Sequence, residues 1–77
     1  MTTRTTVLQV LRDLEIEVGS VEDNTRLRED LGVDSTELIE VAVAIDQRTS
    51  TKSDVNEVLA LKTFGDLVSY VDSAPRQ

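Results

Sequence analysis

Near the start of the chain, apolar residues recur at the spacing of an amphipathic helix, with polar residues between them. The apolar positions are Val7, Leu8, Leu11 and Leu14. The pattern predicts a helix from about Thr5 to Leu14, with the neighbouring threonines as candidate N-caps. Ile16 and Val18 either continue this helix or begin the exit from it, and Gly19-Ser20 is the expected stop.

A second helical pattern follows Asp34. Its apolar residues fall at positions i, i+3, i+4 and i+7 and so form one inward stripe: Leu38, Val41, Ala42 and Ile45. Ile39 and Val43 lie off this stripe, one turn apart. They either pack on the following helix or form a small exposed apolar strip for docking partners. Ala42 and Ala44 are small enough either to let helices approach closely or to leave space beside the stripe.

A long polar stretch separates the two helical patterns and is turn-rich from Val21 to Thr25. A loop of this length in a compact domain is uncommon unless it is functional or pinned. The expected anchors are its apolar side chains, Val21, Leu27 and Leu31. Arg26 and Arg28 are expected at the surface, where nearby acids can pair with them.

The second half of the chain predicts two more helices. Gln47–Ser53 is polar and has no periodicity, which predicts a loosely anchored loop that ends the central helix near Arg48. Asp54 and Glu57 have capping-box spacing and predict a short third helix, and Thr63 opens a fourth. Residues 74–77 are expected to form a frayed tail. The expected fold is therefore all-α, a small four-helix bundle with a long loop between helices 1 and 2 and a short helix 3.

The composition narrows the classes of function. Seventy-seven residues make one small domain, residues 1–77, with no room for a deep active-site cleft beside the core. The absence of cysteine and histidine excludes disulfides, thiolate chemistry and imidazole-bound metal, and it removes the commonest general base. We therefore expect neither an enzyme nor a metal site. No signal core and no apolar run of about 18 residues is present, so a cytoplasmic protein without membrane contact is expected.

The negative charge is concentrated in one part of the chain. The net charge is −7, and residues 29–46 contain six acids and no base, which gives −6 for this segment. Such asymmetry predicts partners with basic surfaces and salt-sensitive encounters, and it argues against a nucleic-acid ligand. The alternative is that these acids only solvate an exposed helix face.

The start of the central helix carries the candidate chemistry. Asp34 precedes the apolar pattern and Glu37 lies three residues later, as in a capping box. Ser35 then occupies the first helical position, beside unpaired backbone N–H groups and the positive end of the helix dipole. Gly32 allows the tight turn that leads into the helix. An exposed serine in this setting suits a phosphate ester better than a buried role.

The run Leu31-Gly32-Val33-Asp34-Ser35 with its acidic helix resembles the Gly-x-Asp-Ser motif of acyl carrier proteins, and the similarity extends along nearly the whole chain. The resemblance implies that Ser35 carries 4′-phosphopantetheine, whose thiol holds acyl groups as thioesters. It also implies that Asp34 helps a phosphopantetheinyl transferase recognise the site. The further partners would be acyl-loading, acyl-transfer or condensing enzymes with basic docking surfaces. The residues expected to contact partners are Thr36, Glu37, Ile39, Glu40, Val43 and Asp46.

Two departures from the family pattern bear on the pathway. Thr36 stands where leucine usually follows the serine, and the segment after Asp46 lacks the usual aromatic residue and Ile-Pro. These differences favour a dedicated carrier of polyketide or lipopeptide biosynthesis over housekeeping fatty-acid synthesis. Separately, the protein is expected to be a monomer. The alternative function is a non-catalytic four-helix adaptor that binds a partner helix, with Ser35 unmodified.

Overall fold

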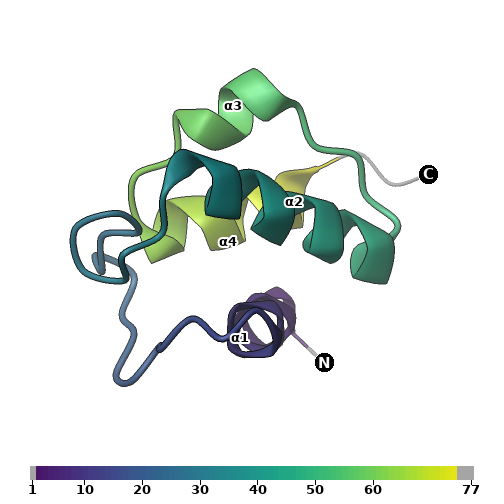
Figure 1. The fold of residues 1–77 in the computed structure, drawn as a ribbon. Coiled ribbons are helices and arrows are strands. Elements are labelled where there is room, and N and C mark those ends of the chain that lie inside the picture. The colour runs from purple at the N-terminus through teal and green to yellow at the C-terminus, as the bar shows by residue number, and fades with distance from the viewer. Residues whose placement is uncertain (1, 75–77) are drawn as a thin grey trace.

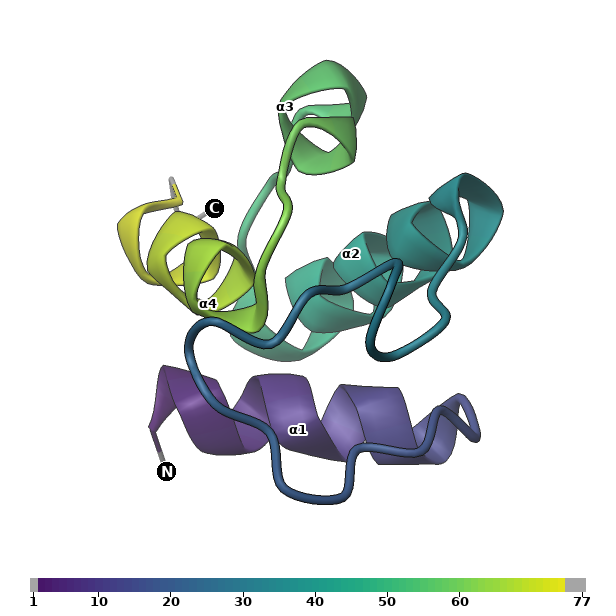
Figure 2. The ribbon, with the colours of Figure 1, turned by 90° about the vertical axis from the view of Figure 1, so that its left-hand side faces the viewer.

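The computed structural model describes residues 2–74, which contain four helices and no β-strand. Their bounds are Thr3–Asp13 for α1, Ser35–Thr49 for α2, Val55–Leu59 for α3 and Phe64–Ser73 for α4. α1 lies on one side of α2 and α4, and α3 lies on the other side (Figure 1, Figure 2). The predicted all-α fold, with its long first loop and short third helix, is confirmed. Of the predicted tail, residues 75–77 lie outside the described part of the chain.

The core is built from aliphatic side chains of all four helices together with one phenylalanine. The predicted inward stripe of α2 is fully formed, since Leu38, Val41, Ala42 and Ile45 are all buried. They meet further buried residues on the other helices, namely Val7, Val10, Leu11, Val58, Phe64, Leu67 and Val71. Burial of these apolar surfaces is the main force that holds the helices together.

α1 begins and ends earlier than its apolar pattern predicted. Thr2 is the N-cap, and its hydroxyl accepts a hydrogen bond from the Thr5 N–H at 3.2 Å. At the other end Glu15 adopts a left-handed conformation, with φ of 63°. The Ile16 N–H then bonds to the Leu11 carbonyl, which completes a Schellman motif and buries Ile16. The predicted stop at Gly19-Ser20 was therefore wrong.

The end of α2 also differs from the prediction. The helix continues through Thr49 and ends at Ser50, which is left-handed with φ of 56°. The following residues are anchored by Asp46, whose carboxylate accepts hydrogen bonds from the Thr51 hydroxyl at 2.7 Å and from the Ser53 N–H at 2.9 Å. Thr51 is buried. The polar run is thus partly helix, and its remainder is tied to the helix by a carboxylate.

The long loop between α1 and α2 is pinned to the start of α4. Leu27 is fully buried, as predicted, and its N–H bonds to the Lys62 carbonyl at 2.9 Å. Val21 and Leu31 pack against the core, which confirms the other two predicted anchors. Gly65 lets the loop lie directly against the start of α4. Its N–H donates to the Asp23 carbonyl at 2.8 Å, and a Cβ at this position would lie 2.8 Å from the same oxygen.

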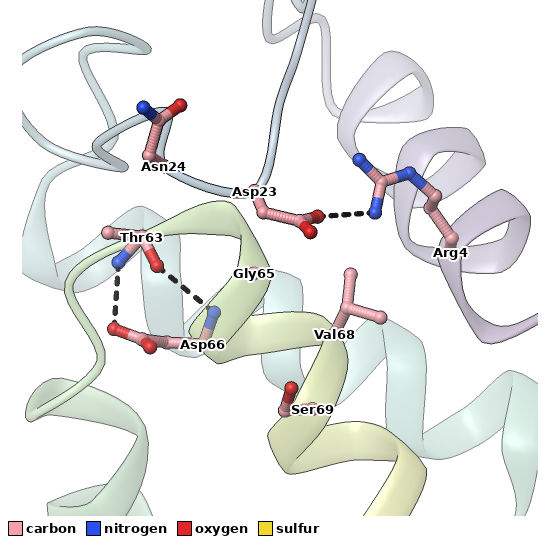
Figure 3. A pocket seen from close by; sticks show the side chains of 8 residues that line it. All are labelled: Arg4, Asp23, Asn24, Thr63, Gly65, Asp66, Val68 and Ser69. Carbon is pink, nitrogen blue, oxygen red and sulfur yellow. Dashed lines mark hydrogen bonds and ion pairs between the residues drawn. The ribbon is translucent and has the colours of Figure 1, made fainter.

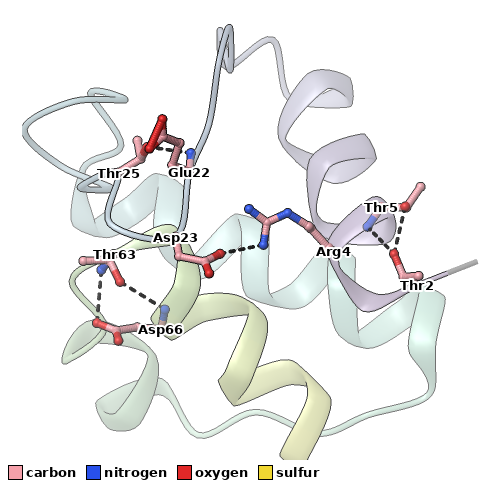
Figure 4. Close-up of polar contacts among 8 residues, drawn as sticks. All are labelled: Thr2, Arg4, Thr5, Glu22, Asp23, Thr25, Thr63 and Asp66. Atoms are coloured by element: carbon pink, nitrogen blue, oxygen red, sulfur yellow. Dashed lines mark hydrogen bonds and ion pairs between the residues drawn. The ribbon is translucent and has the colours of Figure 1, made fainter.

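Arg4 links α1 to this junction. Its guanidinium donates to the Asp23 carboxylate at 2.6 Å (Figure 3). The same guanidinium lies 5.0 Å from the centroid of the Phe64 ring. Next to it, Thr63 and Asp66 form the capping box of α4 (Figure 4). An open hollow of about 490 Å³ lies beside these residues, and the charged groups in its lining, Arg4, Asp23 and Asp66, already have partners within it.

Tyr70 connects α4 to α3. Its hydroxyl donates to the Glu57 carboxylate at 2.8 Å and accepts from the Asp54 N–H at 2.9 Å. Asp54 caps α3 as predicted, since its carboxylate accepts from the Glu57 N–H. The Glu57 carboxylate does not bind the Asp54 N–H directly, because the Tyr70 hydroxyl lies between the two groups. Partial burial raises the pKa of Tyr70, and the neighbouring Glu57 carboxylate adds to the effect. No helix in residues 2–74 has the length and apolar character needed to span a membrane.

Candidate functional site

Ser35 is the first residue of α2, and its side chain is exposed. The predicted capping box is present around it. The Asp34 carboxylate accepts from the Glu37 N–H at 2.8 Å, while the Glu37 carboxylate accepts from the Asp34 N–H at 3.4 Å. Two reciprocal bonds thus fix the backbone on both sides of Ser35 and present its hydroxyl to solvent beside the first-turn amides.

The turn that leads to Ser35 is well ordered by its own hydrogen bonds. Gly32 has φ of 71°, a conformation in which a side chain would be strained. Val33 is buried, and its N–H donates to the Leu27 carbonyl at 2.9 Å. Earlier in the turn, the Asp30 carboxylate accepts from the Arg26 backbone N–H and guanidinium. The bond from the Arg26 guanidinium is the main cause of a lowered pKa of Asp30.

Arg28 is the site residue that the sequence did not reveal. One nitrogen of its guanidinium, Nη2, donates to Ser35 Oγ at 3.5 Å, a long hydrogen bond, and to the Leu59 carbonyl at 3.2 Å. An open hollow of about 290 Å³ is lined by Arg28, Gly32, Val33, Asp34 and Ser35. The adjacent acids Glu29 and Asp30 suggested local pairing, but they pair with Arg26 instead.

The predicted docking residues lie along α2, and most of their side chains face outward. Thr36 and Glu40 are exposed, Val43 is 51% exposed, and Glu37 and Ile39 are half-buried. Asp46 differs, because its carboxylate is occupied by Thr51 and Ser53. The docking role of these residues stays a prediction, and Asp46 has an additional role because its carboxylate anchors the loop after α2.

A small hollow lies between α2 and α3, beside these docking residues. It is bordered by Ile39, Ala42, Val43, Asp46, Ser53, Val55 and Val58 and has a volume of about 40 Å³. This is close to the volume of a single water molecule in the liquid, about 30 Å³. Ala42 thus leaves little space beside the stripe.

Comparison with known proteins decides the family. The model described as "Phosphopantetheine attachment site" matches residues 5–71. The acyl carrier protein MbtL of Mycolicibacterium paratuberculosis is 35% identical over 72 residues, which cover 92% of this chain and 81% of that protein. MbtL of Mycobacterium bovis is 37% identical over 71 residues, covering 91% and 84%. The chain belongs to the acyl carrier protein family.

Membership in the acyl carrier proteins favours the carrier function over the adaptor alternative. Proteins of this family are carriers and not catalysts, and their prosthetic group is 4′-phosphopantetheine. The start of α2 fits such a group in three respects. Ser35 offers an exposed hydroxyl, the hollow around it is open, and Arg28 and the first-turn amides supply donors for an anionic phosphate.

Proposed function

We propose that Ser35 is the attachment point of 4′-phosphopantetheine and that this protein carries acyl intermediates between the enzymes of a dedicated biosynthetic pathway. The observation that carries the proposal is an exposed serine hydroxyl at the first position of a capped helix, in a chain of this family. When bound, the group supplies the thiol that this cysteine-free chain lacks, and the acyl cargo is held there as a thioester.

The chain's own residues present the site. Asp34 and Glu37 hold the first turn of α2 in place, and Gly32 and Val33 fix the turn before it. When a phosphopantetheinyl transferase binds, little of the backbone around Ser35 has to become ordered. The entropy cost of binding is therefore lower. In the proposal, Asp34 aids recognition by the transferase because it caps α2 and so fixes the position of Ser35.

The outer face of α2 is proposed as the docking surface for the transferase and for acyl-loading, acyl-transfer or condensing enzymes. Thr36, Glu37, Ile39, Glu40 and Val43 combine acids with a small apolar strip. Together with the charge of −6 over residues 29–46, this surface suits partners whose docking face is basic around an apolar centre.

The class of pathway rests on two sequence features. Thr36 is exposed next to Ser35, where a partner enzyme would meet a polar side chain in place of the family's usual leucine. The loop after Asp46 is held by hydrogen bonds to a carboxylate instead of by an apolar anchor. Both differences favour partners adapted to this carrier, as in polyketide or lipopeptide biosynthesis, over the general enzymes of fatty-acid synthesis.

Intact mass after co-expression with a phosphopantetheinyl transferase tests the attachment. The wild-type protein should gain the mass of one phosphopantetheine, and Ser35→Ala should gain none while its helical circular dichroism is unchanged. Ser69→Ala, which removes another exposed hydroxyl from a helix, should be modified like the wild type. Modification of Ser35→Ala, or an unmodified wild-type protein, would refute the proposal.

A further inference from the structure

Arg28 is a cation with no carboxylate partner among residues 2–74. Arg4, Arg26 and Arg48 form ion pairs with acids among these residues, whereas Arg12, like Arg28, does not. The Arg28 guanidinium instead contacts a hydroxyl and a backbone carbonyl, which are neutral. Its guanidinium is therefore not held in an ion pair among residues 2–74, and it lies beside the hydroxyl at which the proposed function adds a negative charge.

The geometry of Arg28 suits a phosphodiester on Ser35. A phosphorus bonded to Ser35 Oγ places its anionic oxygens two bonds beyond an atom that Arg28 Nη2 already approaches to 3.5 Å. Hydrogen bonds between a guanidinium and a phosphate oxygen are among the stronger ones in proteins, because both groups are charged. The guanidinium also has N–H donors beyond those that it directs at Ser35 and Leu59.

Arg28 also binds the Leu59 carbonyl, so its guanidinium contacts two helices. Leu59 is the last residue of α3, and it accepts from the same Arg28 nitrogen at 3.2 Å. Arg28 thus connects the start of α2 to the end of α3, two places that are far apart in the sequence. A phosphate held by Arg28 would lie between these two helix ends.

We propose that Arg28 is the residue that binds the phosphate of the prosthetic group, by donating to an anionic oxygen while it keeps its bond to the Leu59 carbonyl. The inference rests on the proposed attachment at Ser35. Arg28 then fixes the base of the arm against the end of α3, and it offsets the negative charge that modification adds to an already acidic segment.

The test compares wild-type protein, Arg28→Gln and Arg26→Gln, each in the unmodified form and with phosphopantetheine attached. Arg26→Gln is the matched control, because it removes the same charge from the same turn but from a guanidinium that pairs with Asp30. The first measurement is the ³¹P chemical shift of the modified proteins. The resonance of Arg28→Gln should move away from the wild-type position by more than the resonance of Arg26→Gln does.

The second measurement is the change in Tm that modification causes. In the wild type and in Arg26→Gln, Arg28 adds a contact on modification, whereas in Arg28→Gln it cannot. The change in Tm should therefore be less favourable for Arg28→Gln by about 2–4 °C at low ionic strength, as for an exposed charge pair in a domain of this size. The difference should shrink as salt is raised.

Two outcomes would overturn the inference, and they can be told apart from failure of the attachment. Full modification by mass, with the ³¹P shift and the change in Tm the same in Arg28→Gln as in the wild type, would refute the role of Arg28 alone. Equal effects in Arg28→Gln and Arg26→Gln would show a general charge effect and would also refute it. An unmodified wild-type protein would refute the attachment itself.

Discussion

The hydroxyl of Tyr70 lies between the two residues that would otherwise form the capping box of α3. It accepts from the Asp54 N–H and donates to the Glu57 carboxylate, so a side chain of α4 completes the N-terminus of α3. A five-residue helix has little stability of its own, since helix nucleation is costly. The position of α3 therefore depends on α4 through one phenolic oxygen.

Tyr70→Phe should lower the free energy of unfolding by about 1 kcal/mol, because it leaves two polar groups without their partner while the ring stays in place. Urea denaturation followed by circular dichroism measures this change. Glu57→Gln keeps an acceptor for the hydroxyl and should cost less. Equal stability of Tyr70→Phe and the wild type would show that water replaces the hydroxyl fully.

Asp30 should make the turn before Ser35 sensitive to acid. Its pKa is lowered in the folded protein, chiefly by the hydrogen bond from the Arg26 side chain. A carboxyl group of this kind stabilises the fold above its ordinary pKa of 3.8, and the contribution is lost as pH falls through the lower native value. The Tm of Asp30→Asn should thus be below that of the wild type at pH 7, and the difference should begin to shrink below about pH 3.8 and vanish below the lowered native pKa.

The control for this measurement is Glu29→Gln, because Glu29 approaches the same guanidinium only to 3.7 Å. It should have a smaller effect at pH 7. A difference between Asp30→Asn and the wild type that persisted unchanged at acidic pH would contradict the assignment of the stabilising contact to the ionised carboxylate.

Local signals in the sequence predicted the centre of the site but not its surroundings. Asp34, Ser35 and Glu37 are close in sequence, so their capping box follows from spacing alone. Arg28 could not be placed in this way. Its acceptors are seven and 31 residues away, and only the packing of α3 beside α2 brings the Leu59 carbonyl to it.

At the scale of the helices, the ends of α1 and α2 are formed in the same way, which the sequence did not reveal. Glu15 and Ser50 adopt left-handed conformations at the ends of α1 and α2, a role that usually falls to glycine. Neither residue is a sequence signal for a helix end, so Gly19-Ser20 was expected as the stop after α1, and the polar run from Gln47 was expected to be loop although α2 continues through Thr49. The buried faces were predictable because helical periodicity carries that information directly.

The loop after α2 should depend on Asp46. Asp46→Ala removes a carboxylate that accepts from Thr51 and from two donors of Ser53, and it should lower the free energy of unfolding by about 2 kcal/mol. Amide hydrogen exchange should become faster at residues 50–53 and stay slow in the first turns of α2. Unchanged exchange in this loop would show that burial of Thr51 alone holds it.

Glu40→Ala is the matched control for Asp46→Ala, because it removes an exposed acid from the same helix. It should leave both the stability and the exchange of residues 50–53 close to those of the wild type. The pair of variants separates the anchoring role of a particular carboxylate from the general effect of a lower negative charge.

Across the whole molecule, the acids of α2 should govern the rate at which partners engage. Glu37→Lys and Glu40→Lys should slow loading by the phosphopantetheinyl transferase, and the wild-type rate should fall as salt is raised, because steering by charge is screened. Glu17→Lys makes the same change of charge at an exposed position outside residues 29–46 and should have a weaker effect. Equal rates for all variants and salt concentrations would show that the acidic face only solvates α2.

The fixed backbone around Ser35 also has a consequence for the geometry of transfer. A tether that starts from a rigid point sweeps a volume set by its own length, whereas one that starts from a mobile loop spreads its free end over a larger volume. With the arm attached at Ser35 as proposed, the capping box and the buried Val33 would immobilise its origin, so the docking orientation would set the local concentration of the thiol at a partner's active site. A small rotation of α2 on a partner could then select which of two neighbouring active sites receives the cargo.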